Sequence, residues 1–136
     1  MENIKKKKKS GIGSRKKIAQ THFNRYIRSR DQLSGGTWIC ISCGKEIIKP
    51  LASHYFSVKS YSHMRYDEMN VHTACYYCNT HLHGNLLEYR RMLIIKYGEE
   101  YVNELELKGF NKPKHRTAKF EREYVEKIIK KYNAKV

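Results

Sequence analysis

Two CxxC pairs constrain the fold of this chain more than any other feature of its sequence. Cys40 and Cys43 form the first pair, and Cys75 and Cys78 form the second. A CxxC turn presents two thiolates from one tight loop, and two such turns that meet in space make the closed tetrahedral site that structural Zn²⁺ prefers. The sequence therefore predicts a Cys₄ zinc site, with redox use of one pair or unpaired buried thiols as the alternatives.

The segment between the two pairs is unusually long and rich in histidine. Residues 44–74 separate them, whereas zinc ribbons usually have a gap of roughly 15 to 20 residues. Five of the seven histidines of the chain fall between positions 54 and 83. Histidine and asparagine side chains in and just after the insert are His54, His63, Asn70, His72, Asn79, His81 and His83. We therefore expect a functional element to be inserted between the zinc ligands.

The charge of the chain points to nucleic acid. Lys and Arg number 28 against 13 Asp and Glu, which gives a formal net charge of +15 over 136 residues. Such a charge attracts a phosphate polyanion, although the run Lys5–Lys9 alone would also fit an ordinary solvated surface. No apolar stretch has the length of a membrane span or the pattern of a secretory signal, so a cytoplasmic protein with reduced cysteines is expected.

The pattern along the chain predicts one small α+β domain with flanking helices. Hydrophobic residues make up 40% of the sequence, which leaves a small core that a bound metal would help to stabilise. The predicted segments are a flexible basic arm (1–17), a basic amphipathic helix and linker (18–36), a zinc-bound core (37–98) and C-terminal helices (99–136).

Within these segments, the apolar spacing predicts individual elements. We expect a hairpin with a long loop between Lys45 and Tyr66, and a helix from Asn79 to Tyr97 in which Gly84 is the weak point. Shorter helices are expected at 99–107, capped by Gly109, and at 120–132. On the predicted helix after the second cysteine pair, Asn79 and His83 are four residues apart and would present both side chains to one ion, while His81 would point elsewhere.

Longer strings of residues carry a resemblance to a known family. The strings FNRYIRSRD, CISCG, ASHYFS, MRYDEMNVHTACYYCNTHLHGNLLEYR and YGEEYVNELE, within residues 22–107, resemble the NinG (Rap) recombination family of lambdoid phages. That family is similar in motif order to His-Asn-His nucleases and to the phage recombination endonuclease VII. The resemblance implies a zinc-stapled ββα-metal core and a phage or prophage resolvase that cuts branched recombination intermediates, such as Holliday junctions, in a bacterial host.

The resemblance also implies roles for single residues. His54 takes the place of the general base, and Asn70 takes the place of the middle asparagine that orients the loop and the histidine. Asn79 takes the position of the terminal ligand of a catalytic Mg²⁺ or Mn²⁺, and His83 that of a second ligand on the helix. Ser53 departs from the wider superfamily, which often has a metal-binding aspartate there, and a hydroxyl is a poor substitute for a carboxylate.

DNA contacts and assembly follow from charge and from the expected reaction. The residues predicted to contact DNA are Arg25, Arg28, Arg30, Lys59, Arg65, Arg90 and Arg91. Tyr76 and Tyr77 are expected either to stack on bases at a branch point or to pack on the cysteine turn. Two symmetric cuts in a junction suggest a homodimer paired through the stripes of the last two helices. The alternatives are a non-catalytic zinc-finger DNA-binding or adaptor protein and an RNA-directed nuclease.

Overall fold

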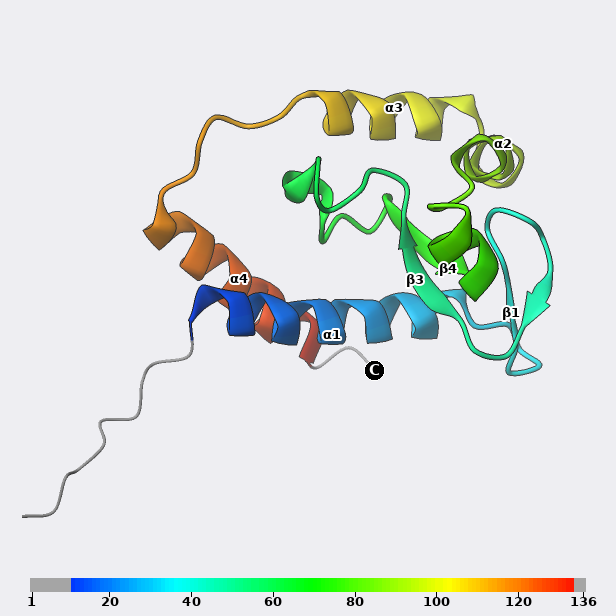
Figure 1. The fold of residues 1–136 in the computed structure, drawn as a ribbon, viewed down its shortest axis with the longest axis horizontal. Coiled ribbons are helices and arrows are strands. Elements are labelled where there is room, and N and C mark those ends of the chain that lie inside the picture. Colours follow the sequence, from blue (N-terminus) through cyan, green and yellow to red (C-terminus); the bar gives the residue numbers. More distant parts are fainter. Residues whose placement is uncertain (1–10, 134–136) are drawn as a thin grey trace, which may run out of the picture.

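The computed structural model describes residues 11–133, and it combines helices with two small antiparallel sheets. The mixed α+β class predicted from the sequence is confirmed. The elements in chain order are α1 (Ile12–Asp31), β1 (Trp38–Ile39), β2 (Glu46–Ile47), β3 (Leu51–His54), η1 (Ser62–Met64), β4 (Val71–Ala74), η2 (Tyr77–His81), α2 (Leu86–Tyr97), α3 (Glu99–Phe110) and α4 (Ala118–Asn133). Figure 1 shows α1 and α4 side by side along one edge, α3 along the opposite edge, and β3 and β4 between them.

The central sheet pairs β3 with β4, with Leu51 opposite Ala74 and His54 opposite Val71. The prediction of a hairpin within residues 45–66 is therefore wrong about its second strand. The aromatic residues that suggested this strand are instead packed in the connecting loop, where Phe56 contacts Phe110 with ring centroids 5.3 Å apart. Aromatic residues favour strands because they pack well there, and here tertiary packing is available without a strand.

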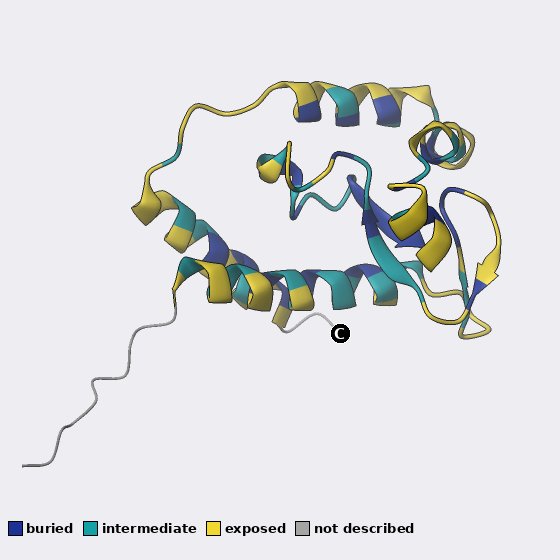
Figure 2. Ribbon diagram, viewed as in Figure 1, coloured by how far each residue is buried: buried dark blue, intermediate teal, exposed yellow. Residues whose placement is uncertain are grey.

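Two apolar clusters stabilise the two sides of the sheet. One lies under α2 and α3 and includes Phe56, Tyr89 and Leu93 together with two of the cysteines. The other lies between α1 and α4, where the rings of Phe23 and Tyr132 meet edge to face at 5.0 Å. Figure 2 shows that the buried positions of α3 and of the α1–α4 pair face the interior of the molecule.

This packing uses the apolar stripes that we expected to support a dimer. On α3, Val102 and Leu105 are buried, and on α4 Val125, Ile128 and Tyr132 are buried within the same chain. These residues are therefore not available for pairing, which is a correction to the predicted dimer surface. Dimerisation itself stays a prediction.

The first helix begins at Ile12, earlier than the predicted start at residue 18. Its first turns gain tertiary contacts that the sequence pattern does not display. Arg15 forms a two-point ion pair with Glu126 of α4, with N–O distances of 2.6 and 2.8 Å. Of the predicted flexible arm, residues 1–10 lie outside the described part of the chain, and residues 12–17 are helical.

Gly109 is not the cap of α3, which extends through it to Phe110. A Cβ atom at this position would lie 2.3 Å from Cζ of Phe56. The glycine is required because the ring of Phe56 packs directly against the helix backbone. A glycine near the expected end of a helix suggested a cap, but its role here is a close approach between two segments.

Candidate functional site

The four cysteines come together, as the CxxC pairs predicted. Their sulfur atoms all lie within 4.8 Å of one another. The first pair lies around the β1–β2 turn, and the second lies at the junction of β4 and η2. Cys40 and Cys78 are buried, Cys75 is partly covered, and Cys43 faces solvent. None of the four forms a disulfide.

The geometry of the cluster fits a tetrahedral metal ion. Zinc–sulfur bonds of about 2.3 Å imply edges of about 3.8 Å between sulfurs, and the Cys43 and Cys75 sulfurs are 3.9 Å apart. The backbone N–H of Cys43 donates to the Cys40 sulfur at 3.5 Å, and the N–H of Cys78 donates to the Cys75 sulfur at 3.4 Å. Such N–H donors stabilise thiolates. The four cysteines could therefore hold a metal ion such as zinc.

His54 lies at the end of β3, half-buried, with one ring nitrogen fixed. Its Nε2 is 2.9 Å from the backbone carbonyl oxygen of Arg65. A carbonyl oxygen can only accept a hydrogen bond, so Nε2 donates and carries the proton in the neutral ring. Nδ1 is then left with a lone pair. Burial lowers the pKa of His54, and the charge of Arg65 acts in the same direction, although the hydrogen bond to its carbonyl opposes them.

Asn70 fixes the backbone of the loop that follows His54. Its side chain is fully buried, and its Oδ1 accepts from the N–H of Phe56 at 2.7 Å. Its Nδ2 donates to the carbonyls of Phe56 and Met64 at 3.0 and 3.1 Å. The backbone N–H of Tyr55 also donates to the Asn70 carbonyl. One side chain therefore cross-links both ends of the loop beside the histidine.

Asn79 and His83 are not on one helical face, because the helix predicted over 79–97 is interrupted. The π-helix η2 ends at His81, and His83 and Asn85 both have left-handed backbone conformations, with φ of 50° and 51°. The chain turns here because Gly84 is held by the hydroxyl of Ser42, which donates to its carbonyl at 2.7 Å. A Cβ on Gly84 would lie 3.9 Å from the His54 carbonyl oxygen, so this turn adjoins the end of β3.

The other histidines of the insert have internal partners. His72 is 2% exposed, and its Nδ1 is 3.2 Å from the hydroxyl of Tyr89. Burial lowers the pKa of His72 to about 3, with the charge of Arg30 acting in the same direction. His63 in η1 bonds through Nε2 to the carbonyl of Lys108 at 2.9 Å. His72 is thus closed off from any substrate, whereas His54 is partly open.

Ser53, which stands where the wider superfamily often has an aspartate, points into the core. Its side chain is fully buried and its hydroxyl oxygen has no hydrogen-bond partner. It lies opposite His72 in the β3–β4 register. Successive side chains of a strand point to opposite faces, so Ser53 and His54 face different sides of β3.

Several basic residues that were expected to contact DNA have partners within the chain. Arg30 donates to the carbonyls of Glu68 and Val71 at 2.7 Å each and pairs with Asp31. Other predicted contacts pair with neighbours: Arg25 with His22, Arg65 with Gln20, Arg90 with Glu106 and Arg91 with Glu88. Lys59 is exposed at the loop tip, and Arg28 is partly covered at the end of α1. Arg30 therefore holds α1 against β4, and its guanidinium is engaged by partners within the fold.

Sequence reasoning missed two residues that support this region. Asn85 donates from Nδ2 to the sulfur of Cys78 at 3.6 Å. Tyr89 is fully buried, and its hydroxyl donates to the Ser53 carbonyl at 2.8 Å and meets His72. The spacing of Tyr89 within the predicted helix over 79–97 indicates a core position, but the sequence does not show a partner for its hydroxyl. Tyr76 and Tyr77 are about 60% exposed and both lie against His81.

These features define a small mixed α+β domain with a cluster of four cysteines that could bind a metal ion and a histidine-bearing β-hairpin inserted between the two cysteine pairs. The sequence profile described as "Bacteriophage Lambda NinG protein" matches residues 2–136. The chain belongs to this NinG family.

Individual relatives are similar over part of their length. The chain is 41% identical to "Protein ninG" of Escherichia phage 933W over 91 residues, which are 66% of this chain and 43% of that protein. The same coverage applies to "Protein ninG" of Salmonella phage P22 at 41% identity and of Escherichia phage lambda at 40%. The match therefore spans less than half of the length of these relatives. No solved structure matches the chain, and no helix within residues 11–133 combines the length and apolar character needed to cross a membrane.

Proposed function

We propose that this protein is a metal-dependent DNA endonuclease of the His-Asn-His type that acts on branched recombination intermediates. It would do so during phage growth in a bacterial host. The observation that carries the proposal is the fixed tautomer of His54, whose Nε2 donates to the Arg65 carbonyl while Nδ1 keeps its lone pair.

A base for phosphodiester hydrolysis must be neutral at working pH and held in one orientation. Burial lowers the pKa of His54, which keeps the ring neutral near pH 7. Asn70 supports this orientation because it fixes the backbone at Phe56 and Met64 on either side of the loop. His54 would then accept the proton of an attacking water at Nδ1, a contribution typically worth about 10²- to 10⁴-fold in rate.

The candidate ligands of a catalytic cation are Asn79 and His83. Their placement rests on the turn at Gly84, which brings this segment to the end of β3, and not on a shared helical face. A bound Mg²⁺ or Mn²⁺ would supply a counter-charge for the developing phosphorane and for the leaving oxygen. The metal at the four cysteines would have no such role, because four thiolates complete its coordination.

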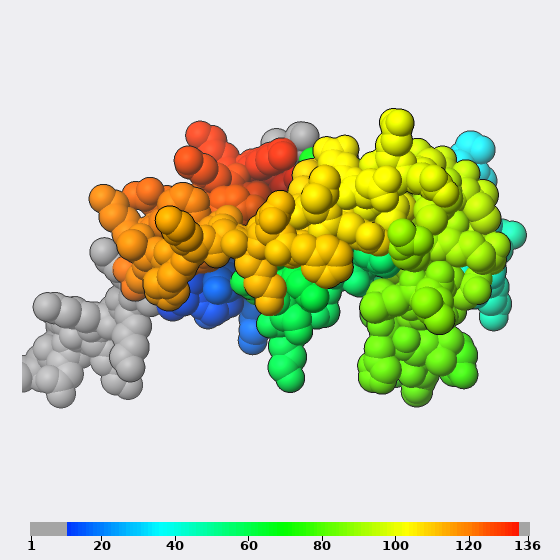
Figure 3. Space-filling model, turned by 90° about the horizontal axis from the view of Figure 1, so that it is seen from above, coloured from blue at the N-terminus to red at the C-terminus, as the bar shows by residue number. Residues whose placement is uncertain are grey.

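The surface of the molecule offers a place for DNA. Figure 3 shows two projections, one formed by the tip of the β3–β4 loop and the other by the segment around η2, with a hollow between them. Lys59 is exposed on the first projection, and Tyr76 and Tyr77 are exposed on the second. With a formal net charge of +15 in the whole chain, such a hollow favours a phosphate backbone.

The decisive experiment is digestion of a labelled four-way junction beside linear duplex, with Mg²⁺ or Mn²⁺, by the wild type and by His54→Ala. We expect junction binding to survive and single-turnover cleavage to fall by at least about 10²-fold. Glu123→Ala changes an exposed position of α4 outside the proposed site and serves as the control, which should cleave normally. A single-turnover cleavage rate in His54→Ala equal to that of the wild type would contradict the assignment of His54 as the base. Matched RNA junctions test whether RNA is also a substrate.

A non-catalytic DNA-binding or adaptor protein is the second candidate. Residue 53 favours this second candidate, because a buried serine stands in the place where the wider superfamily often has a metal-binding carboxylate. The same digestion separates the two functions. A wild-type chain that binds the junction but never nicks it, at any concentration of either metal, would be an adaptor.

A further inference from the structure

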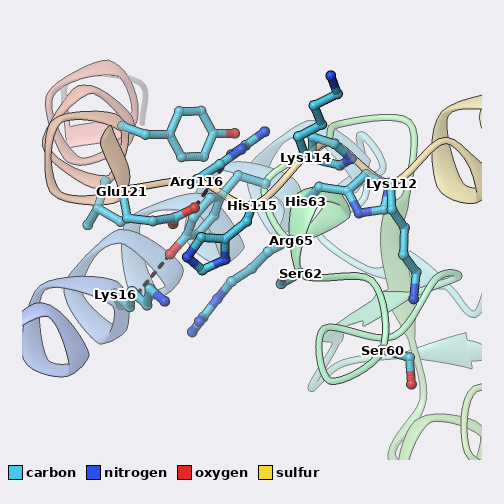
Figure 4. Close-up of a pocket in the computed structure, with 14 residues that line it drawn as sticks. Lys16, Ser60, Ser62, His63, Arg65, Lys112, Lys114, His115, Arg116 and Glu121 are labelled. Atoms are coloured by element: carbon cyan, nitrogen blue, oxygen red, sulfur yellow. Dashed lines mark hydrogen bonds and ion pairs between the residues drawn. The ribbon is translucent and has the colours of Figure 1, made fainter. Parts of the chain in front are cut away.

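A basic pocket lies where the start of α1, the β3–β4 loop and the linker between α3 and α4 meet, as Figure 4 shows. It encloses about 330 Å³. The cationic side chains that line it are Lys16, Arg65, Lys112, Lys114 and Arg116. Among the described residues of its lining, Glu121 is the one carboxylate, which leaves an excess of four positive charges, since 5 − 1 = 4.

Aromatic rings and the side-chain amide of Gln20, whose Oε1 accepts from Arg65 Nε at 2.7 Å, hold three of these cations in place. The ammonium of Lys112 lies 4.7 Å from the centre of the Tyr61 ring. The guanidinium carbon of Arg116 lies 5.0 Å from the Phe120 ring centre and 5.3 Å from that of Tyr124. A ring attracts a cation without cancelling its charge. The pocket is therefore preorganised and positive, and the 3.9 Å contact between Arg116 and Glu121 offsets little of its charge.

We propose that this pocket binds consecutive phosphodiester groups of a nucleic-acid backbone, which makes it a second anchoring site beside the proposed cleavage site. The inference rests on the proposed function in taking DNA as the ligand. Figure 4 shows the cationic ends of Arg65, Lys112 and Lys114 pointing in different directions around the pocket, not toward one centre. That arrangement suits an extended polyanion, whereas one small phosphate needs donors that converge.

Arg65 connects the pocket to His54. Its side chain lines the pocket, and its backbone carbonyl accepts the hydrogen bond from His54 Nε2. Arg65 therefore fixes the position of a DNA backbone in the pocket relative to the ring of His54. The pocket residues position the substrate and take no part in the chemical step.

The test compares two double variants that remove the same charge. Lys112→Gln with Lys114→Gln alters the pocket, and Lys127→Gln with Lys130→Gln alters exposed positions of α4 that do not line it. Affinity for labelled duplex is measured by fluorescence anisotropy between about 50 and 200 mM salt. The pocket variant should lower the slope of log K against log salt by about 1.8, since each phosphate contact contributes about 0.9. The α4 variant should retain the wild-type slope.

Equal slopes in the two variants, or a wild type that does not bind DNA, would overturn the proposal. Titration calorimetry with inorganic phosphate alone is expected to give no saturable binding. Saturable binding that is lost in the pocket variant while the DNA slope is unchanged would identify a small-anion site and would also overturn it. If DNA binding depends on the pocket but the wild type never cuts, the nuclease function fails and the pocket proposal stands.

Discussion

The two ends of this molecule are held together by different physics. At the cysteine end, β1 and β2 have two residues each, and the sulfurs of Cys40, Cys43, Cys75 and Cys78 bring together segments from positions 38 to 85. At the α1–α4 end, Phe23, Ile27, Tyr66 and Tyr132 form an apolar cluster with aromatic rings edge to face. The cysteine end combines its own apolar cluster with four sulfurs that could bind a metal ion, whereas the α1–α4 end depends on buried area alone. Each end should therefore fail under a different perturbation.

The largest effect is expected from the cysteines. Replacing Cys40 or Cys78 with Ser should release zinc and unfold the cysteine end, because about 10–16 kcal/mol of zinc binding in small sites is also folding free energy. Metal content by atomic absorption and thermal melting provide the measurement. Retention of one zinc per chain with a wild-type melting curve would show that the cysteines have another role.

A smaller loss of stability is expected when a ring is removed from the aromatic cluster between α1 and α4. Phe23→Ala should lower the free energy of unfolding by about 3–5 kcal/mol, the usual cost of such a cavity. Zinc content should not change, since Phe23 packs in the cluster between α1 and α4. Ile18→Ala on the exposed side of α1 is the control. Loss of zinc in Phe23→Ala would mean that the two ends fold as one cooperative unit and are not stabilised independently.

Acid should destabilise the hairpin between the two ends through His72. The folded-state pKa is lowered to about 3, whereas an unfolded histidine titrates near 6.5. The stabilisation is present above pH 6.5 and is lost as pH falls from 6.5 toward 3, because the unfolded chain takes up the proton first. Each pKa unit corresponds to about 1.4 kcal/mol. The free energy of unfolding, measured by denaturant titration, should depend on pH in this window in the wild type but less so in His72→Gln. Parallel pH dependences in the two proteins would show that His72 is not the cause of the acid sensitivity.

The smallest effect concerns the contact between α3 and the loop. Gly109→Ala should destabilise the fold by up to about 2 kcal/mol, because overpacking of about 1–3 kcal/mol against Phe56 opposes a gain in helix propensity of about 1 kcal/mol. Gly109→Ala in a Phe56→Leu background tests the cause by chemical denaturation. A penalty that is unchanged in that background would place the strain elsewhere.

The parts of the fold that could be predicted are those set by local pattern. The CxxC spacing predicted that the four cysteines could come together around one metal ion, and apolar periodicity predicted α4. The break at His83 could not be predicted in the same way, because the next residue, Gly84, is held by the hydroxyl of Ser42, which lies 42 positions before Gly84 in the sequence. The roles proposed for His54 and Asn70 follow from the family resemblance and stay predictions, while their hydrogen bonds to Arg65 and Phe56 are set by the loop and could not be predicted.

The three hydrogen bonds of the Asn70 side chain divide the loop after β3 into a fixed base and a free tip. Both ends of the segment from Phe56 to Met64 are tied to one buried amide, while Lys59 and Ser60 between them are exposed. The tip can therefore change in length or carry an inserted peptide while the hairpin below it keeps its shape. Changes at residues 59–60 can therefore alter the proposed DNA-binding surface, which includes Lys59, without disturbing the position of His54 at the base.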